Sequence, residues 1–189
     1  MHIVDELILE RAPRLVNKPR LFKHIKPWLY RLLDYNKAVS VVDTIMPMTG
    51  RDAFDHITQR VNPDIRITGA ENIPASGRCV IIANHPTGLA DGMAVFKALA
   101  PRRPEHIYLA NADALRVIPK GEDIIIPVEW VKDKRTHQKA RQTLISTKKA
   151  IQNNTCVVIF PSGVLGKLTW RGIKDKPWQN SAAMLAKKY

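Results

Sequence analysis

The sequence lacks long hydrophobic runs. Its apolar stretches are short, as in 80–83, 124–128 and 157–160, whereas a helix that crosses a membrane needs about 20 apolar residues. The first residues, Met-His-Ile-Val-Asp-Glu, include acids and no apolar core, so we do not expect a secretory signal. With 45% hydrophobic and 25% charged residues, the composition excludes a wholly disordered, collagen-like or coiled-coil chain. The 189 residues are enough for one globular domain with a core.

Cysteine is also scarce. The two cysteines, Cys79 and Cys156, each open an apolar, strand-like segment. They form no Cys-x-x-Cys pair and no cluster with histidine. We therefore predict two buried thiols in a reducing compartment, and no metal site.

Acidic residues are few relative to basic ones. The chain has 30 Lys and Arg against 17 Asp and Glu, which gives a net charge of +13. Most of the excess lies in three blocks, residues 11–37, 132–149 and 167–189, which together hold 21 basic and 3 acidic residues. Such a balance predicts an anionic partner, which could be nucleic acid, an anionic membrane surface or a phosphorylated small molecule.

Residues 1–60 are expected to form a helical, basic segment that faces a membrane. Apolar residues recur at helical spacing between Leu21 and Leu33, with basic residues on the other faces. In one interpretation this amphipathic helix lies in a lipid headgroup layer, with Trp28 and Tyr30 at its boundary. In the other, the helix packs on the domain and its lysines are solvated. A second amphipathic helix is expected over 38–60, interrupted near Pro47 and Gly50.

Residues 61–189 predict an α/β domain with a mostly parallel sheet flanked by helices, because strand-like and helix-like segments alternate. The expected strands are 64–68, 78–83, 106–110, 123–128 and 156–160, and the expected helices are 91–100, 136–153 and 178–189.

The segment after the strand-like run 78–83 reads Asn-His-Pro-Thr-Gly-Leu-Ala-Asp-Gly and is the most informative one. Ligands bind where parallel strands end, and His85 and Asp91 are six residues apart across this turn. The carboxylate could orient the imidazole and leave its second nitrogen as a general base. In a simpler interpretation, Asp91 only caps the next helix and His85 bonds to the turn. A second turn, Phe-Pro-Ser-Gly at 160–163, also follows a strand.

These motifs resemble the glycerolipid acyltransferase superfamily, in its hemolysin-type or ornithine-lipid-type branch. The resemblance covers roughly residues 38–189. It includes His-x5-Asp, the Phe-Pro-Ser-Gly turn and the segment Arg-Gly-Ile-Lys-Asp-Lys-Pro-Trp at 171–178. Most of the superfamily has His-x4-Asp, and it has Phe-Pro-Glu-Gly where this chain has Ser162. The superfamily's fourth motif would lie beyond Tyr189, so we expect the domain to be incomplete at that end.

The resemblance implies transfer of a fatty acyl group from acyl-CoA or acyl carrier protein to a hydroxyl or amine of a phospholipid or amino-lipid precursor. His85 would be the base and Asp91 its orienting partner. The implied oxyanion or acyl-donor loop comprises Thr87, Gly88, Ser162 and Gly163, and the candidate acceptor or phosphate ligands are Lys132, Lys134, Arg135 and Arg171. No bound cofactor or metal is expected.

The expected location is cytoplasmic, peripheral on the cytoplasmic membrane, with acyl carrier protein as a further candidate partner. Two alternatives remain open at this point. One is a basic α/β domain that binds nucleic acid, which the low aromatic content of 6% and the lack of a recognisable motif disfavour. The other is an inactive, truncated acyltransferase that only binds lipid.

Overall fold

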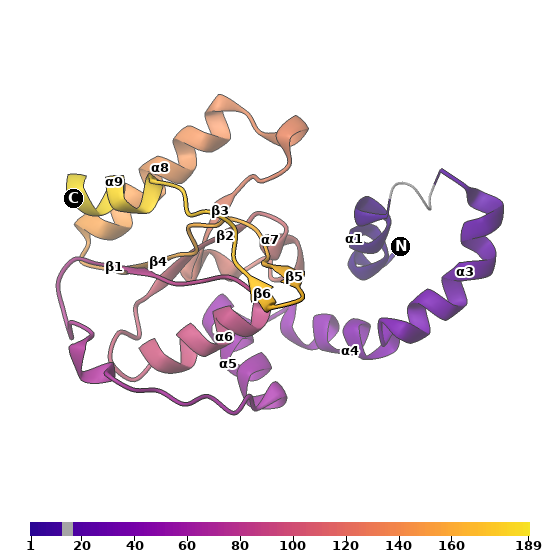
Figure 1. The fold of residues 1–189 in the computed structure, drawn as a ribbon, viewed down its shortest axis with the longest axis horizontal. Coiled ribbons are helices and arrows are strands. Elements are labelled where there is room, and N and C mark those ends of the chain that lie inside the picture. The colour runs from indigo at the N-terminus through magenta and orange to yellow at the C-terminus, as the bar shows by residue number, and fades with distance from the viewer. Residues whose placement is uncertain (13–16) are drawn as a thin grey trace.

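The computed structural model describes residues 1–12 and 17–189, except for the side chains of Pro19 and Lys132 (Figure 1). Its α-helices are α1 (Ile3–Arg11), α3 (Pro19–Leu32), α4 (Tyr35–Ile45), α5 (Gly50–Val61), α6 (Leu89–Leu99), α7 (Ala114–Val117), α8 (His137–Gln152) and α9 (Ser181–Lys188). The strands are β1 (Cys79–Ile82), β2 (Ile107–Asn111), β3 (Ile125–Val128), β4 (Cys156–Ile159), β5 (Lys167–Thr169) and β6 (Gly172–Lys174). Short 3-10 turns cover Ala70–Asn72, Gly121–Asp123 and Lys132–Lys134.

Four strands form a parallel sheet in the order β1-β4-β2-β3. All four residues of β4 are buried, because helices cover both faces of the sheet. Cys156 and Val158 pack with α6 on one face, and Val157 and Ile159 pack with α8 and α9 on the other. This arrangement confirms the predicted α/β fold with a parallel sheet between helices.

The two cysteines lie side by side in the sheet. Cys79 of β1 is in register with Cys156 of β4, and both are free thiols. Cys156 is fully buried and Cys79 is half-buried. Burial and the neighbouring Cys79 raise the pKa of the Cys156 thiol to about 12, so this thiol stays protonated at neutral pH.

The predicted strand over 64–68 is wrong. This segment has no regular secondary structure and pairs with no strand of the sheet. Ile65 is half-buried but Ile67 is 41% exposed, so only one of the two apolar side chains reaches the domain. The sequence alternates as a strand does, but alternation needs a hydrogen-bonded neighbour before it yields one.

The helices α1, α3 and α4 form an arc beside the sheet domain (Figure 1). Within the arc, the hydroxyls of Tyr30 and Tyr35 donate to Asp5 of α1, at 2.6 and 2.8 Å. Tyr30 therefore contacts α1 through its hydroxyl, and the interpretation that this helix lies in a lipid headgroup layer stays a prediction. Trp28 on the same helix is 65% exposed. The break predicted near Pro47 and Gly50 is confirmed, since α4 ends before it and α5 begins at it.

Candidate active site

His85 lies in the loop after β1, at the edge where the parallel strands end. Its imidazole ring stacks on Phe160, which follows β4, with the ring centroids 4.3 Å apart. The His85 side chain is 22% exposed although its Nδ1 atom is buried. The exposed part of the ring therefore lies away from Nδ1, so one side of the imidazole is enclosed and another is open to a ligand.

Asp91 lies in the first turn of α6 and contacts the same loop. Its Oδ2 atom is 3.3 Å from Nδ1 of His85, a distance suited to an ion pair, but the two groups are not aligned as a hydrogen bond. The carboxylate also accepts the N–H groups of Thr87 and Gly88, at 2.9 and 2.8 Å, and the Thr87 hydroxyl at 2.6 Å. Asp91 thus caps α6 and approaches His85 at once. The two N–H groups already have an acceptor and are not free for the expected oxyanion role.

The Phe-Pro-Ser-Gly turn is tightly built. The N–H of Gly163 donates to the Phe160 carbonyl at 3.0 Å, and the buried Ser162 hydroxyl donates to the Val164 carbonyl at 3.1 Å. Gly163 has a φ of +64°, and a Cβ at this position would lie 2.5 Å from the Trp130 ring. In this structure the Gly163 N–H is therefore also occupied, and the turn contributes shape rather than a free donor.

Asp175 connects the segment 171–178 to the His85 loop. No role was predicted for this residue from the sequence. It follows β6, and its Oδ2 atom accepts the His85 backbone N–H at 3.2 Å and the Trp178 indole N–H at 3.1 Å, while Oδ1 accepts the Lys176 N–H at 3.1 Å. Burial alone raises the pKa of the Asp175 carboxyl, but the hydrogen bonds from the Trp178 indole and the His85 backbone outweigh it, the nearby Ser162 hydroxyl also lowers it, and the pKa lies below its ordinary value. The carboxylate is therefore ionised at neutral pH and fixes the His85 backbone. Its presence in the segment 171–178 was the one signal that could have found it.

The candidate acceptor ligands do not form one cluster. Arg135 lines a cavity of about 320 Å³ together with Trp130 and Phe160, at the end of the sheet that carries His85. Its Nε donates to the backbone carbonyl of Glu129 at 3.2 Å. Among the candidates whose side chains the structure describes, Arg135 is the one that shares a cavity with a ring touching His85.

Lys134 and Arg171 lie elsewhere. Lys134 is 3.4 Å from Glu10 of α1, and Arg171 stacks on Trp170 at the tip of the β5–β6 hairpin, 4.3 Å from its ring centroid. Lys132 lies in the 3-10 turn Lys132–Lys134, and its side chain is outside the described part of the structure. The prediction that these cations share one ligand with Arg135 therefore has no geometric support among the described side chains.

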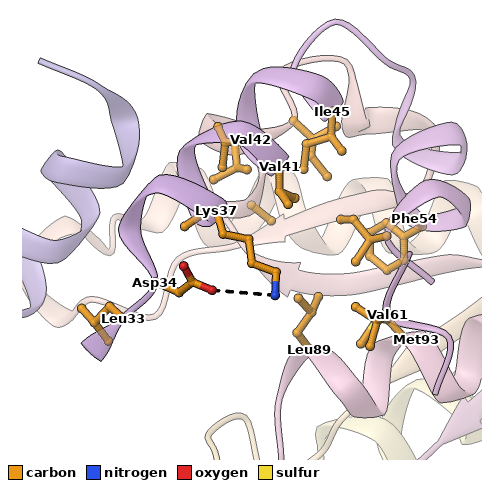
Figure 2. Close-up of a pocket in the computed structure, with 15 residues that line it drawn as sticks. Leu33, Asp34, Lys37, Val41, Val42, Ile45, Phe54, Val61, Leu89 and Met93 are labelled. Atoms are coloured by element: carbon orange, nitrogen blue, oxygen red, sulfur yellow. Dashed lines mark ion pairs between the residues drawn. The ribbon is translucent and has the colours of Figure 1, made fainter. Parts of the chain in front are cut away.

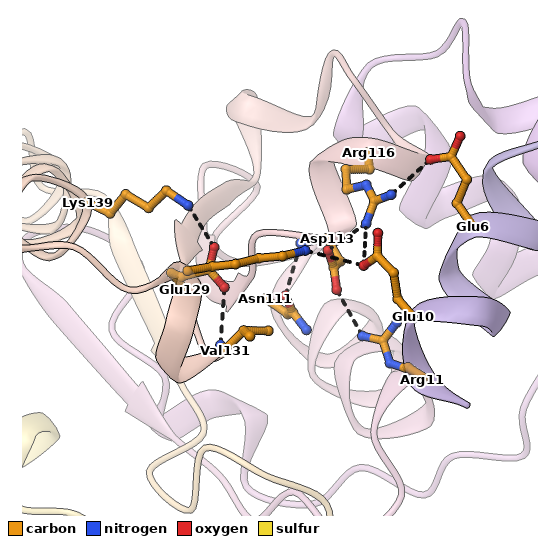
Figure 3. Close-up of polar contacts among 10 residues, drawn as sticks. Glu6, Glu10, Arg11, Asn111, Asp113, Arg116, Glu129, Val131 and Lys139 are labelled. Atoms are coloured by element: carbon orange, nitrogen blue, oxygen red, sulfur yellow. Dashed lines mark hydrogen bonds and ion pairs between the residues drawn. The ribbon is translucent and has the colours of Figure 1, made fainter. Parts of the chain in front are cut away.

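A network of ion pairs attaches α1 to the sheet domain (Figure 3). Arg116 of α7 contacts Glu6 and Glu10, each at 2.9 Å, and Asp113 at 3.2 Å. Arg11 contacts the same Asp113 at 3.0 Å. Hydrogen bonds with acidic side chains, that with Glu10 having the largest effect, raise the pKa of Arg116. Some of the basic side chains therefore form ion pairs within the protein rather than being available to an anionic partner.

Helices α4, α5, α6 and α7 line an apolar groove of about 580 Å³ (Figure 2). Helices α4 and α5 contribute Val41, Ile45 and Phe54, and α6 contributes Leu89 and Met93. Leu89, one of the lining residues, follows Gly88 directly in the chain. The groove could not be predicted from the sequence, because it forms only when four separate helices pack together.

A model of the acyltransferase family matches residues 64–189. The chain belongs to the acyltransferase family. The match includes the turn with His85 and Asp91, the Phe-Pro-Ser-Gly turn and Asp175. The resemblance to lipid acyltransferases stated from the motifs is thereby confirmed at the level of the family.

This acyltransferase has two curated relatives, both named lyso-glycine lipid O-acyltransferase. The protein from Phocaeicola vulgatus is 25% identical over 133 residues, which cover 70% of this chain and 46% of the relative. The protein from Bacteroides thetaiotaomicron is 20% identical over 179 residues, or 94% of this chain and 63% of the relative. The chain therefore spans less than two thirds of either relative. No solved structure matches it.

Two further findings concern membranes and metals. Across residues 1–12 and 17–189 of the acyltransferase, every helix is too short or too polar to cross a membrane. Within the same ranges, no three His, Cys, Asp or Glu side chains are grouped so that they could hold a metal ion.

Proposed function

We propose that this acyltransferase moves a fatty acyl group from a thioester to a hydroxyl of a lysolipid, with His85 as the general base. The observation that carries the proposal is the 3.3 Å approach of Asp91 Oδ2 to His85 Nδ1 at the carboxyl end of the sheet. The names of the two relatives favour a hydroxyl over an amine, and an acceptor that contains an amino acid. Acyl-CoA and acyl carrier protein are both candidate donors.

The proton movements follow from the position of the imidazole. His85 takes the proton of the acceptor hydroxyl through its exposed side while the oxygen attacks the thioester carbonyl. Asp91, close to Nδ1, stabilises the imidazolium that forms. The tetrahedral intermediate then expels the thiolate, and the proton on His85 passes to that sulfur. The step consumes one thioester and one hydroxyl and yields one ester and one thiol, and it needs no acyl-enzyme.

The apolar groove is the proposed site of a fatty chain. Its volume of about 580 Å³ and its lining by Val41, Phe54 and Met93 suit a hydrocarbon better than a polar ligand. Leu89 lines the groove and follows Gly88 in the chain, so we assign the carbonyl end of a bound chain to the side of the groove nearest the Gly88 turn. We assign the phosphate groups of the donor, or the polar part of the acceptor, to the cavity lined by Arg135.

The location proposed for the protein is the cytoplasmic membrane surface. An acyltransferase must reach a lysolipid that resides in a bilayer, and a net charge of +13 favours an anionic surface. Binding to vesicles with anionic lipid that decreases at high salt would support this location, whereas equal binding to neutral vesicles would contradict it.

The test is transfer by the His85→Ala variant. Purified chain is supplied with acyl-CoA or acyl carrier protein and a panel of lysolipids, including a lyso-glycine lipid, and products are identified by mass spectrometry. We expect His85→Ala to lose about 10²–10⁴-fold in turnover with its circular dichroism unchanged. His137→Ala, which removes an exposed histidine of α8, should retain full activity. Transfer by His85→Ala within threefold of the unaltered chain would reject the base, and no transfer to any acceptor by the folded chain would reject the function.

A further inference from the structure

The β5–β6 hairpin exposes an unusual number of large apolar side chains. Leu168 and Trp170 are 83% and 87% exposed, and Leu165 and Ile173 are 56% and 52% exposed. Within the described ranges, the two strands pair only with each other, and each is three residues long. Contiguous exposed apolar groups of this kind mark interaction sites in soluble proteins.

The same hairpin is positively charged. Lys167, Arg171 and Lys174 are exposed, and residues 164–174 contain no acidic residue. The Arg171 guanidinium stacks on Trp170 with 4.3 Å between its carbon and the ring centroid. The hairpin thus joins apolar side chains that prefer hydrocarbon to cations that prefer anionic headgroups, a combination typical of segments at a membrane interface.

The hairpin is attached to the loop that carries His85. The N–H of Gly166 donates to the His85 carbonyl at 3.2 Å, and a Cβ on Gly166 would lie 3.0 Å from the Cα of Pro86. Leu165 packs against Gly88 so closely that a Cβ there would lie 2.8 Å from it. Figure 1 places β5 and β6 beside the start of α6. A surface that binds the tip of the hairpin therefore lies close to the His85 loop.

We propose that the tip of the β5–β6 hairpin inserts into the headgroup region of an anionic bilayer and so places the His85 loop at the membrane surface. The proposal deepens the proposed function, since it names the surface from which the lysolipid would enter. The two strands have three residues each, whereas a stable protein interface takes about 20–30 residues a side. A second copy of the chain would also bring like charges together, because each hairpin carries three cations.

The experiment locates the membrane-facing tryptophan in the full chain. Vesicles containing anionic lipid with brominated acyl chains quench a tryptophan that enters the bilayer. We expect quenching in the unaltered chain, in Trp28→Phe and in Trp178→Phe, and a loss of most of it in Trp170→Phe. Loss of the quenching in Trp28→Phe but not in Trp170→Phe would place α3, rather than the hairpin, in the bilayer and would overturn the proposal.

Affinity provides a second measurement. Leu168→Ser/Trp170→Ser should bind anionic vesicles about tenfold or more weakly, because both side chains leave water on insertion. Ile145→Ser, which removes a 46% exposed side chain of α8, should bind within about twofold of the unaltered chain. Equal vesicle affinity of the hairpin variant and the unaltered chain would reject insertion. A change in Trp170 emission on adding acyl carrier protein, with no quenching on adding vesicles, would assign the hairpin to a protein partner and reject insertion as well.

Activity assays separate this proposal from the proposed function. With a lysolipid below its micelle concentration, the hairpin variant should transfer at the rate of the unaltered chain, and with the lysolipid in vesicles it should be slower by about the factor lost in binding. Equal rates of the two proteins on vesicles would overturn the role of the hairpin while leaving that of His85. For His85→Ala we expect the opposite result, which is loss of transfer with vesicle binding equal to that of the unaltered chain.

Discussion

Asp175→Ala tests whether one carboxylate holds the His85 loop in place. Asp175 accepts three N–H groups, of which the His85 N–H is partly buried and those of Lys176 and Trp178 are exposed. A hydrogen bond to a charged acceptor contributes roughly 1.5–3 kcal/mol, and less where water can replace it. We expect Asp175→Ala to lower the free energy of unfolding by about 2–4 kcal/mol. Asp175→Asn keeps one oxygen acceptor and should cost about 1–2 kcal/mol.

Urea unfolding between pH 3 and pH 7 measures the effect. Because the pKa of Asp175 is lower in the folded protein than its ordinary value of 3.8, its stabilisation is present above that value and is lost as the pH falls through the folded-state pKa. The difference in unfolding free energy between the unaltered chain and Asp175→Asn should be constant from pH 7 to about pH 5 and shrink toward pH 3. Asp64→Asn, an exposed aspartate, controls for the change in net charge. A difference that stays constant down to pH 3, or a loss below about 0.5 kcal/mol in Asp175→Ala, would refute the reasoning.

Two other changes probe the packing around the site. Gly163→Ala should destabilise the fold by about 3 kcal/mol, because its Cβ would meet the Trp130 ring at 2.5 Å as well as strain a positive φ. Gly77→Ala has a positive φ but no atom within 4 Å, so in urea unfolding it should cost only about 1 kcal/mol, and equal losses would contradict the clash. Arg116→Ala should speed hydrogen exchange in α1 without affecting β4, since it removes the ion pairs to Glu6 and Glu10. Unchanged exchange in α1 would show that these ion pairs do not hold the helix.

The sheet could be predicted because its strands are apolar runs with clear boundaries. The fully buried β4 reads Cys-Val-Val-Ile, flanked by Thr155 and by the turn that begins at Pro161. Residues 64–68 have a similar local pattern, but whether they pair depends on a neighbour that local sequence does not reveal. The hairpin over 167–174 escaped prediction because exposed apolar and basic residues alternate there without a buried face.

The contact between His85 and Asp91 could be predicted from the sequence because both residues lie in one short segment between a strand and a helix. The contact between His85 and Asp175 was not, since 90 residues separate them. The groove beside Leu89 depends in the same way on how helices from three parts of the chain pack. Sequence motifs therefore identified the central residues of the candidate site, while long-range packing determined the residues that surround and support them.

The departure at position 162 illustrates the difference between a motif and a site. Ser162 stands where the superfamily has a glutamate, so the motif alone indicates that an acid is missing. The structure brings the carboxylate of Asp175 to the same turn, where Ser162 contributes to its lowered pKa. Ser162 is only 5% exposed, and a second carboxylate in that space would repel the first. The short serine is thus compatible with the nearby Asp175 carboxylate in a way that glutamate would not be. The carboxylate at this turn comes from a residue that is distant in the sequence but near in the fold.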